Sequence, residues 1–221
     1  LEQGSGYVLY TRHFNQPISG KLQLTGLRDY AIVYVDGEKI GELNRCFNDY
    51  TLDIDISFNS TLEIFVENMG RINYGAQITE NNKGIISPVI INDIEIEGGW
   101  DMYCLPFSDC PDLKTLSASN IYSTTDKKLL GLPAIYEGTF SLTETGDTFL
   151  DMDDWGKGIV FINGKNLGRY WKIGPQQTLY VPGVWLNKGE NKIVIFEQQN
   201  DVLHQEIKTV KTPVIHKLKS F

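Results

Sequence analysis

Residues 70–75 (GRINYG) gather three side chains that could recognise a ligand: Arg71, Asn73 and Tyr74. They follow directly on a predicted strand, where functional loops tend to lie. Tyr74 could present its ring to a sugar or to a neighbouring domain. The alternative is a structural turn in which Arg71 pairs with an acid and Asn73 caps backbone groups. The segment is therefore a candidate contact loop.

Residues 168–177 (GRYWKIGPQQ) form a second dense cluster, in which Arg169, Tyr170 and Trp171 combine aromatic rings with a planar cation. Sugars pack their C–H faces on aromatic rings while their hydroxyls make directed hydrogen bonds. Trp, Tyr and Arg are equally the usual anchors of protein interfaces. These three residues are therefore predicted to contact either a sugar or another domain.

Nothing in the sequence supports a catalytic group. Glycoside cleavage uses two carboxylates that face each other across a cleft. Asp151, Asp153 and Asp154 do not fit this arrangement, because strand alternation sends neighbours to opposite faces and the rest fall in a turn. The three histidines have no Ser, Cys or metal-ligand partner at a sequence spacing typical of a catalytic pair or a metal site. We therefore predict no catalytic residue, no metal site and no cofactor in this chain.

The three cysteines cannot all pair within one chain. Cys104 and Cys110 could bridge the loop between them, but free buried thiols are an equally good interpretation. None of the three has the spacing of a zinc cluster, so no cysteine metal site is predicted.

Short strands must position these segments. Residues 52–56 (LDIDI) alternate between apolar and acidic side chains, which buries one face of a strand and exposes the other. The predicted strands of the first half cover residues 7–14, 21–24, 31–35, 51–56, 61–66, 75–79 and 85–96. Those of the second half cover residues 135–142, 148–152, 159–162, 177–181, 191–198, 202–208 and 214–218. Regular short strands separated by turn residues indicate an all-β sandwich or jelly roll.

One hairpin occurs twice in the chain. Residues 32–41 (IVYVDGEKIG) return as residues 159–168 (IVFINGKNLG), and each copy enters an Asp-Gly or Asn-Gly pair, the strongest short-range hairpin signal. Residues 62–67 and 192–197 repeat as well, since both are alternating strands that end in an acid. The two copies begin 127 residues apart. This spacing excludes solenoids and propellers, whose repeating units run to about 20–50 residues. The duplication predicts two tandem β-domains of common origin.

The two predicted domains cover residues 1–98 and 99–221. A Gly-Gly pair ends the first domain, and residues 100–103 begin the first strand of the second. Residues 106–132 are a polar connector that packs as a loop over the second sandwich, in which residues 114–116 could open a short helix. Each domain is near the usual size of about 100–150 residues.

The composition argues against some functions. Twenty-eight acidic residues against 20 basic ones give a net charge of −8, which disfavours nucleic acid because phosphate binding needs clustered Lys and Arg. No apolar run approaches the roughly 18 residues of a membrane-spanning helix, and no signal peptide is visible. The chain begins without Met, which is expected of an excised fragment whose targeting segment would lie upstream.

Longer motifs carry a family resemblance over nearly the whole chain. These motifs are residues 6–10, 67–75, 83–85, 155–171 and 174–182. In this order they resemble the C-terminal region of β-galactosidases of glycoside hydrolase family 35. The resemblance is weakest in the connector between the domains.

The resemblance implies two tandem galactose-binding-like (jelly-roll) β-sandwich domains that pack against an N-terminal (β/α)8 barrel. In the family that barrel carries both catalytic glutamates, and this chain has no positions that match them. Glu67 and Glu197 end equivalent strands and are interpreted as structural. The chain is thus expected to be a non-catalytic C-terminal fragment, inactive alone, of a retaining β-galactosidase that hydrolyses terminal β-galactosides in carbohydrate metabolism. Its expected partners are the barrel and, through the parent enzyme, the β-galactoside.

The same resemblance implies roles for the two segments described first. The loop around Tyr74 is expected to approach the active-site mouth of the barrel. Trp100, Trp155 and Trp171 are interpreted as core or interdomain anchors rather than sugar platforms. A stand-alone carbohydrate-binding module and an adhesion or assembly module are the alternatives. A polysaccharide-degrading parent is expected to be exported, to the periplasm, the extracellular space or the lysosome.

Overall fold

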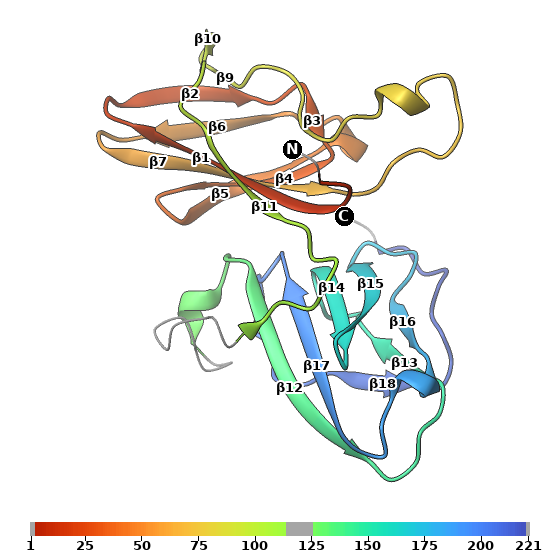
Figure 1. Cartoon of the computed structure of the whole chain (residues 1–221). Helices are drawn as coiled ribbons and strands as arrows, with labels where there is room; N and C mark the ends of the chain where they lie inside the picture. Colours follow the sequence, from red (N-terminus) through yellow and green to blue (C-terminus); the bar gives the residue numbers. More distant parts are fainter. Residues whose placement is uncertain (1–2, 114–125, 220–221) are drawn as a thin grey trace. The chain divides into compact units, whose positions relative to one another are not determined.

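The computed structural model describes residues 3–113 and 126–219, so the helical start predicted at residues 114–116 lies outside the described residues. The chain divides into two compact units, residues 1–108 and 109–221 (Figure 1). Both units are built from β-strands and short 3-10 helices, which confirms the predicted all-β class. In the described part of the chain no helix is long and apolar enough to cross a membrane.

The first unit contains two main antiparallel sheets. Its strands are β1 (Gly6–Phe14), β2 (Ile18–Gln23), β3 (Leu27–Arg28), β4 (Tyr30–Val35), β5 (Glu38–Asn44), β6 (Thr51–Ile56), β7 (Ser60–Asn68), β8 (Gly84–Ile85), β9 (Ile90–Ile91), β10 (Ile94–Glu95) and β11 (Asp101–Leu105). The 3-10 helices are η1 (Arg45–Phe47) and η2 (Ile78–Glu80). One sheet has the order β11-β1-β7-β4-β5 and the other β10-β9-β2-β6, while β3 pairs with β8.

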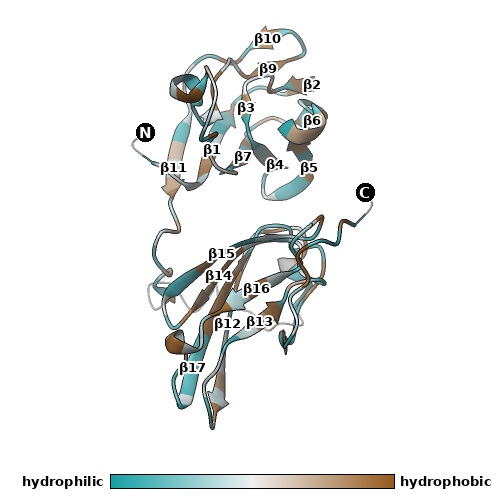
Figure 2. Ribbon diagram, turned by 90° about the vertical axis from the view of Figure 1, so that its right-hand side faces the viewer, coloured by the Kyte–Doolittle hydropathy of each residue, from teal (hydrophilic) through white to brown (hydrophobic). Residues whose placement is uncertain are grey.

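The core of the first unit lies between these two sheets, because alternate residues of each strand point to the same face. The five-stranded sheet contributes Val33 and Ile64, and the four-stranded sheet contributes Leu22 and Ile56. The alternation predicted for residues 52–56 is confirmed, since Ile54 and Ile56 are buried and the acids between and beside them are exposed. Figure 2 shows the apolar residues as brown segments on the strands of each unit.

The second unit repeats this arrangement with fewer strands. They are β12 (Ala134–Leu142), β13 (Thr148–Asp151), β14 (Lys157–Ile162), β15 (Lys165–Trp171), β16 (Thr178–Val181), β17 (Gly189–Glu197) and β18 (Lys208–Val210), with the 3-10 helices η5 (Lys127–Leu129) and η6 (Gly183–Trp185). The sheets have the orders β12-β17-β14-β15 and β16-β13-β18. The core again takes side chains from both sheets, such as Val160 and Ile195 from one and Leu150 and Leu179 from the other.

The division between the units lies later in the chain than the predicted 98/99, because β11 belongs to the first unit. It pairs antiparallel with β1, with Tyr7 opposite Leu105 and Thr11 opposite Asp101. Residues 99–108, predicted to open the second domain, therefore complete the edge of the first sheet.

Two strands predicted near the contact loop also differ from the structure. Residues 85–96 form three short strands, because Asn92 and Asp93 adopt left-handed φ values of 49° and 63° and turn the chain back between β9 and β10. Residues 75–79 form no strand and lead through a turn into η2. Residues 69–83 are therefore one long connection between β7 and β8, with η2 as its only regular element. Connections of this length are uncommon in compact domains and often carry function.

The duplicated hairpin is confirmed in detail. β4 and β5 form the first copy and β14 and β15 the second, and both have a bulge at the same place, after Val33 and after Val160. Each turn has two successive residues in the left-handed region. The Asp36 carboxylate accepts the Thr61 N–H at 2.8 Å, and the Asn163 side-chain oxygen accepts the Lys192 N–H at 2.9 Å. The turn side chain thus ties each hairpin to the next strand of its sheet.

We expect Gly37→Ala and Gly164→Ala each to lower the free energy of unfolding of their own unit by about 1–2 kcal/mol. A Cβ at either position meets no atom within 4 Å, so the loss arises from the left-handed φ of 78° and 79° alone. Urea unfolding measures the loss. Gly146→Ala is the matched control, since that site is equally open but not left-handed, and it should leave stability unchanged or raise it by up to about 1 kcal/mol. Equal effects at Gly37 and Gly146 would contradict the assignment.

Candidate functional site

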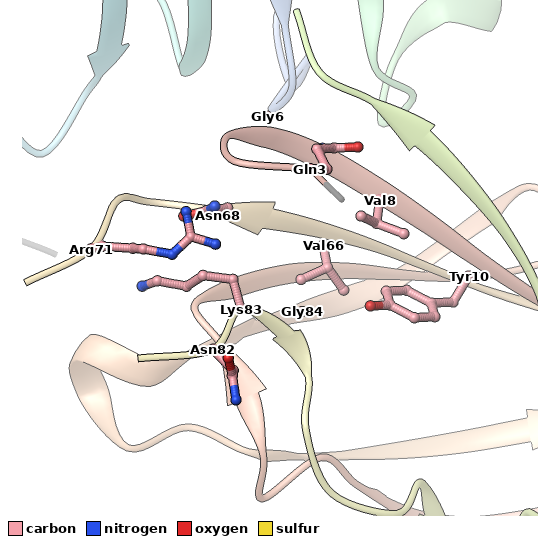
Figure 3. Close-up of a pocket in the computed structure, with 10 residues that line it drawn as sticks. All are labelled: Gln3, Gly6, Val8, Tyr10, Val66, Asn68, Arg71, Asn82, Lys83 and Gly84. Carbon is pink, nitrogen blue, oxygen red and sulfur yellow. The ribbon is translucent and has the colours of Figure 1, made fainter. Parts of the chain in front are cut away.

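A pocket of about 230 Å³ opens in the first unit where β1 begins and β7 ends (Figure 3). It is lined by Gln3, Gly6, Val8, Tyr10, Val66, Asn68, Arg71, Asn82, Lys83 and Gly84. β1 and β7 supply the apolar side chains, and the connection of residues 69–83 supplies both cations. The pocket therefore joins a sheet that fixes its shape to a loop that provides its charge.

Tyr10 forms the inner wall of this pocket. Its hydroxyl accepts the N–H of Ile85 at 3.3 Å, and burial raises the pKa of the phenol, so that the side chain stays neutral. Gly84 has a φ of 91°, and a Cβ there would lie 2.5 Å from the Tyr10 hydroxyl. Glycine is therefore required where β8 passes over the ring.

Arg71 is the one member of the predicted contact loop that reaches the pocket. Its guanidinium donates to the carbonyl of Gly4 at 2.7 Å. In residues 3–113 and 126–219 no carboxylate lies within ion-pair distance of it, so the acid pairing considered for a structural turn is not formed. The guanidinium therefore lies at the rim of the pocket with a neutral carbonyl as its partner.

Lys83 is held by a buried carboxylate. Its ammonium lies 2.6 Å from Asp29, and Arg45 lies 2.9 Å from the other oxygen of the same carboxylate. Asp29 also accepts the N–H of Met69 at 3.0 Å. A buried carboxylate needs such partners because an unpaired charge is costly away from water. The cluster fixes both ends of the connection 69–83, one at Met69 and the other at Lys83.

The rest of the predicted loop points away from the protein. Asn73 is exposed, and the side chain of Tyr74 is 91% exposed. Ile72 and Ile78 on the same connection are 43% and 47% exposed. Neither Asn73 nor Tyr74 lines the pocket. The structure thus separates the three predicted residues into one pocket residue and two that belong to an exposed, partly apolar loop.

The second predicted cluster lies on β15 and is divided by strand alternation. Arg169 is exposed, Tyr170 is 4% exposed and belongs to the core, and Trp171 is half-buried. The Lys157 ammonium stands over the Trp171 ring, 4.3 Å from its centroid. A sugar contact through Tyr170 is therefore wrong, because its ring points inward. Arg169 and Trp171 remain predicted contacts.

Tyr170 reaches Glu197, a buried acid for which the sequence predicts only a structural role. Its hydroxyl lies 3.2 Å from Glu197, and the Glu197 carboxylate also accepts three backbone N–H groups: Gly156 at 2.8 Å, Lys157 at 2.9 Å and Gln199 at 3.0 Å. Burial opposes the charged form more strongly than these donors favour it, and raises the pKa of Glu197 to about 7.

Aromatic groups close this end of the second unit. His204 stacks on Trp155 with 3.9 Å between ring centroids, and its Nε2 lies 3.9 Å from Glu197. Tyr136 packs edge-on against Trp155 and donates its hydroxyl to Asn200 at 2.6 Å. Trp155 is 4% exposed, which confirms it as a core residue. No sequence motif linked these side chains, because they come from three separate segments, at residues 136, 155 and 197–204.

The two acids at the strand ends are not equivalent, contrary to the sequence prediction. Val66 lies opposite Ala31 in the first copy, while Glu197 lies opposite Gly158 in the second. Since Ala31 and Gly158 occupy the same hairpin position, the counterpart of Glu197 is Val66 and not Glu67. The alternation of inward and outward side chains along the second strand could have revealed this difference. Its inward-facing residues are the odd-numbered ones, and the last of them is Glu197.

The side chains that commonly bind metals, and the three cysteines in particular, are not gathered into a cluster in the described part of the chain. The described residues contain no group of three or more His, Cys, Asp or Glu side chains that could hold a metal ion. Cys46, Cys104 and Cys110 are free thiols. The bridge considered for Cys104 and Cys110 is therefore not formed, and the alternative of free thiols is confirmed. Their predicted burial is wrong, because the first two thiols are exposed and the third is partly exposed.

The comparisons with known proteins match both units. A family model described as β-galactosidase, first all-beta domain, covers residues 1–106, and one described as β-galactosidase, galactose-binding domain, covers residues 133–191. Beta-galactosidase 1 of Dictyostelium discoideum is 36% identical over 215 residues, which cover 89% of this chain and 31% of the relative. Beta-galactosidase of Xanthomonas manihotis is 38% identical, over 81% of this chain and 28% of its own length. Beta-galactosidase-1-like protein 2 of Homo sapiens is 37% identical, over 89% of this chain and 30% of the length of that relative. The chain therefore spans about a third of the length of these relatives.

We expect Glu197 to make the second unit more stable in acid than at neutral pH. Its pKa rises from 4.5 to about 7 on folding, so the folded state binds the proton more tightly. The stability that results is fully present below about pH 4.5 and is lost as the pH rises through about 7. At about 1.4 kcal/mol for each pKa unit, the loss amounts to about 3 kcal/mol.

Urea unfolding of the natural chain and of Glu197→Gln between about pH 4.5 and pH 8 measures this effect. The advantage of the natural chain over the variant should shrink as the pH rises. His204 acts in the opposite direction, because burial lowers its pKa, and it is present in both proteins. Glu206→Gln, at a side chain that is 72% exposed, is the control and should show a flat difference. An advantage that stays constant or grows with pH would contradict the prediction.

Proposed function

Because the chain belongs to the β-galactosidase family through both of its β-domains, we propose that it is the non-catalytic C-terminal part of a retaining β-galactosidase. The partial coverage carries this proposal. Two domain models match in tandem, while about 70% of each relative's length has no counterpart in the chain. The remaining part of the protein would carry the catalytic barrel, which these β-domains support.

The chemistry of the two sites agrees with this division of roles. In a retaining glycosidase one carboxylate attacks the sugar and a second carboxyl group, about 5–5.5 Å away, protonates the leaving oxygen. The pocket of the first unit has two cations and no carboxylate in its lining. Glu197 is fully enclosed and occupied by four donors. Both catalytic carboxylates therefore belong to the rest of the protein.

The exposed loop of the first unit is the proposed contact with that catalytic part. Ile72, Tyr74 and Ile78 expose large apolar surface within seven residues of the connection 69–83. Apolar and aromatic side chains gathered in this way are typical of interfaces. Tyr74, as the most exposed of them, is the proposed contact at the active-site mouth.

A stand-alone carbohydrate-binding module is the second candidate, favoured by the match of residues 133–191 to a galactose-binding domain. It requires this chain to bind a neutral galactoside by itself. Saturable heat on calorimetric titration with methyl β-galactoside would favour the module, and no saturable heat would favour the supporting role.

The purified chain should release no nitrophenol from nitrophenyl β-galactoside, whereas the product of the complete gene should hydrolyse it with retention of the anomeric configuration. The reason is that both carboxylates lie outside this chain. Turnover by the chain alone, or a complete gene product that lacks the activity, would overturn the proposal.

In the complete gene product, Tyr74→Ala should lower kcat/KM for a β-galactoside by about tenfold, the loss of one aromatic contact worth about 1.4 kcal/mol. Phe58→Ala is the matched control, because Phe58 is 67% exposed in a turn of the same unit and should leave kcat/KM unchanged. Neither change should alter the unfolding of the isolated chain. A loss of the same size for both variants would argue against a specific role of Tyr74.

A further inference from the structure

The pocket of the first unit carries more positive charge than its surroundings neutralise. Arg71 and Lys83 line it, and Arg45 lies behind Lys83 on the same carboxylate. Within the described part of the chain, Asp29 is the only acid within ion-pair distance of these cations, and it is already shared by Lys83 and Arg45. Arg71 has a neutral partner, the carbonyl of Gly4. One negative charge therefore faces three positive ones.

Both cationic groups lie on the same side of the pocket. Figure 3 shows the side chains of Arg71 and Lys83 extending in opposite directions, one beside the other, from the two ends of the connection that leads from β7 to β8. Two like charges in a partly buried site repel each other, and an anion placed between them removes that repulsion. The rim is therefore suited to an anionic group.

The size and the walls of the pocket suit a small organic anion. Val8 and Val66 give it an apolar wall, the ring of Tyr10 adds an aromatic one, and Asn68 and Asn82 add amide groups to the lining. The volume of about 230 Å³ exceeds the roughly 150 Å³ that admits a benzene molecule in an engineered cavity of another protein. A six-membered ring with a charged substituent, or a single acidic side chain, fits such a space.

The scaffold does not require this end of the sandwich to be open. The second unit fills the equivalent end with its own side chains, because Tyr170 and Glu197 stand where the first unit has Leu43 and Val66. Gly158, in place of Ala31, leaves room for the Tyr170 hydroxyl, from which an added Cβ would be only 2.7 Å distant. The opening and its charge are thus properties of the first unit alone.

We propose that this pocket binds a carboxylate group, with the Arg71 guanidinium as its main partner and Lys83 as a second cation. The planar fork of a guanidinium matches the two oxygens of a carboxylate and stays charged at any physiological pH. The carboxylate belongs either to an acidic monosaccharide or to an acidic side chain from another part of the protein. The sugar source rests on the proposed function, and the side-chain source does not.

Titration of the ¹⁵N-labelled chain at low salt with galacturonate, galactose and acetate tests this proposal through the amide shifts of Asn68 and Gly84. Low salt matters because exposed charges are screened within about 10 Å at 0.1 M. Galacturonate should bind saturably, at least about tenfold more tightly than neutral galactose, since a hydrogen bond to a charged group contributes about 1.5–3 kcal/mol. The substitution Arg71→Gln should weaken the binding of galacturonate by the same factor of at least about ten. Lys188→Gln, which removes an exposed cation of the second unit, is the control and should leave binding unchanged.

The acetate titration distinguishes the two sources. Acetate that binds as tightly as galacturonate indicates an acidic side chain, whereas acetate that binds at least about tenfold more weakly indicates a sugar acid. Equal binding of galactose and galacturonate, an unchanged affinity of Arg71→Gln, or no saturation by either carboxylate up to about 50 mM would overturn the proposal. Hydrolysis by the complete gene product is a separate measurement, so a failed galactosidase assay leaves a carboxylate site standing, and the reverse also holds.

Discussion

The register between each hairpin and the strand beside it determines which side chains enter the core. Side chains alternate with a period of two, so a slip of one residue would turn every apolar residue of a strand to the wrong face. The turn residue prevents this slip in both units. Asp36 and Asn163 have the left-handed backbone that the turn needs, and each places a side-chain oxygen on an N–H of the neighbouring strand. Backbone geometry and a side-chain hydrogen bond therefore specify the same pairing.

This fixed register allowed the two copies to diverge without a change of fold. Ala31, Leu43 and Val66 in the first copy correspond to Gly158, Tyr170 and Glu197 in the second. The first set is apolar and leaves the end of the sandwich open beside a charged loop. The second set forms a buried hydrogen-bonded cluster. A polar group in a core needs all of its partners at once, so these positions are expected to have changed together.

Local signals made the fold predictable, and distant pairing limited what could be said of the sites. The Asp-Gly and Asn-Gly turns and the alternation of residues 52–56 depend on neighbours in sequence, and the structure confirms them. Asp29 and Lys83 form an ion pair although they lie 54 residues apart in the sequence, and no local sequence pattern predicts such a contact. The burial of Tyr170 could have been predicted, because alternation along β15 turns it inward between two more exposed residues. The position of Arg71 in the right loop was predictable, but the pocket beside it depends on segments from both ends of the unit.

The pairing of β11 with β1 also determines where the chain can be divided. The edge strand of a sheet presents unpaired N–H and C=O groups, which invite association with another chain. β11 covers that edge of β1 along five residue pairs. A first domain cut after residue 98 would lose this cover and tend to aggregate through β1. One cut after Ser108 keeps the edge paired and should remain monomeric.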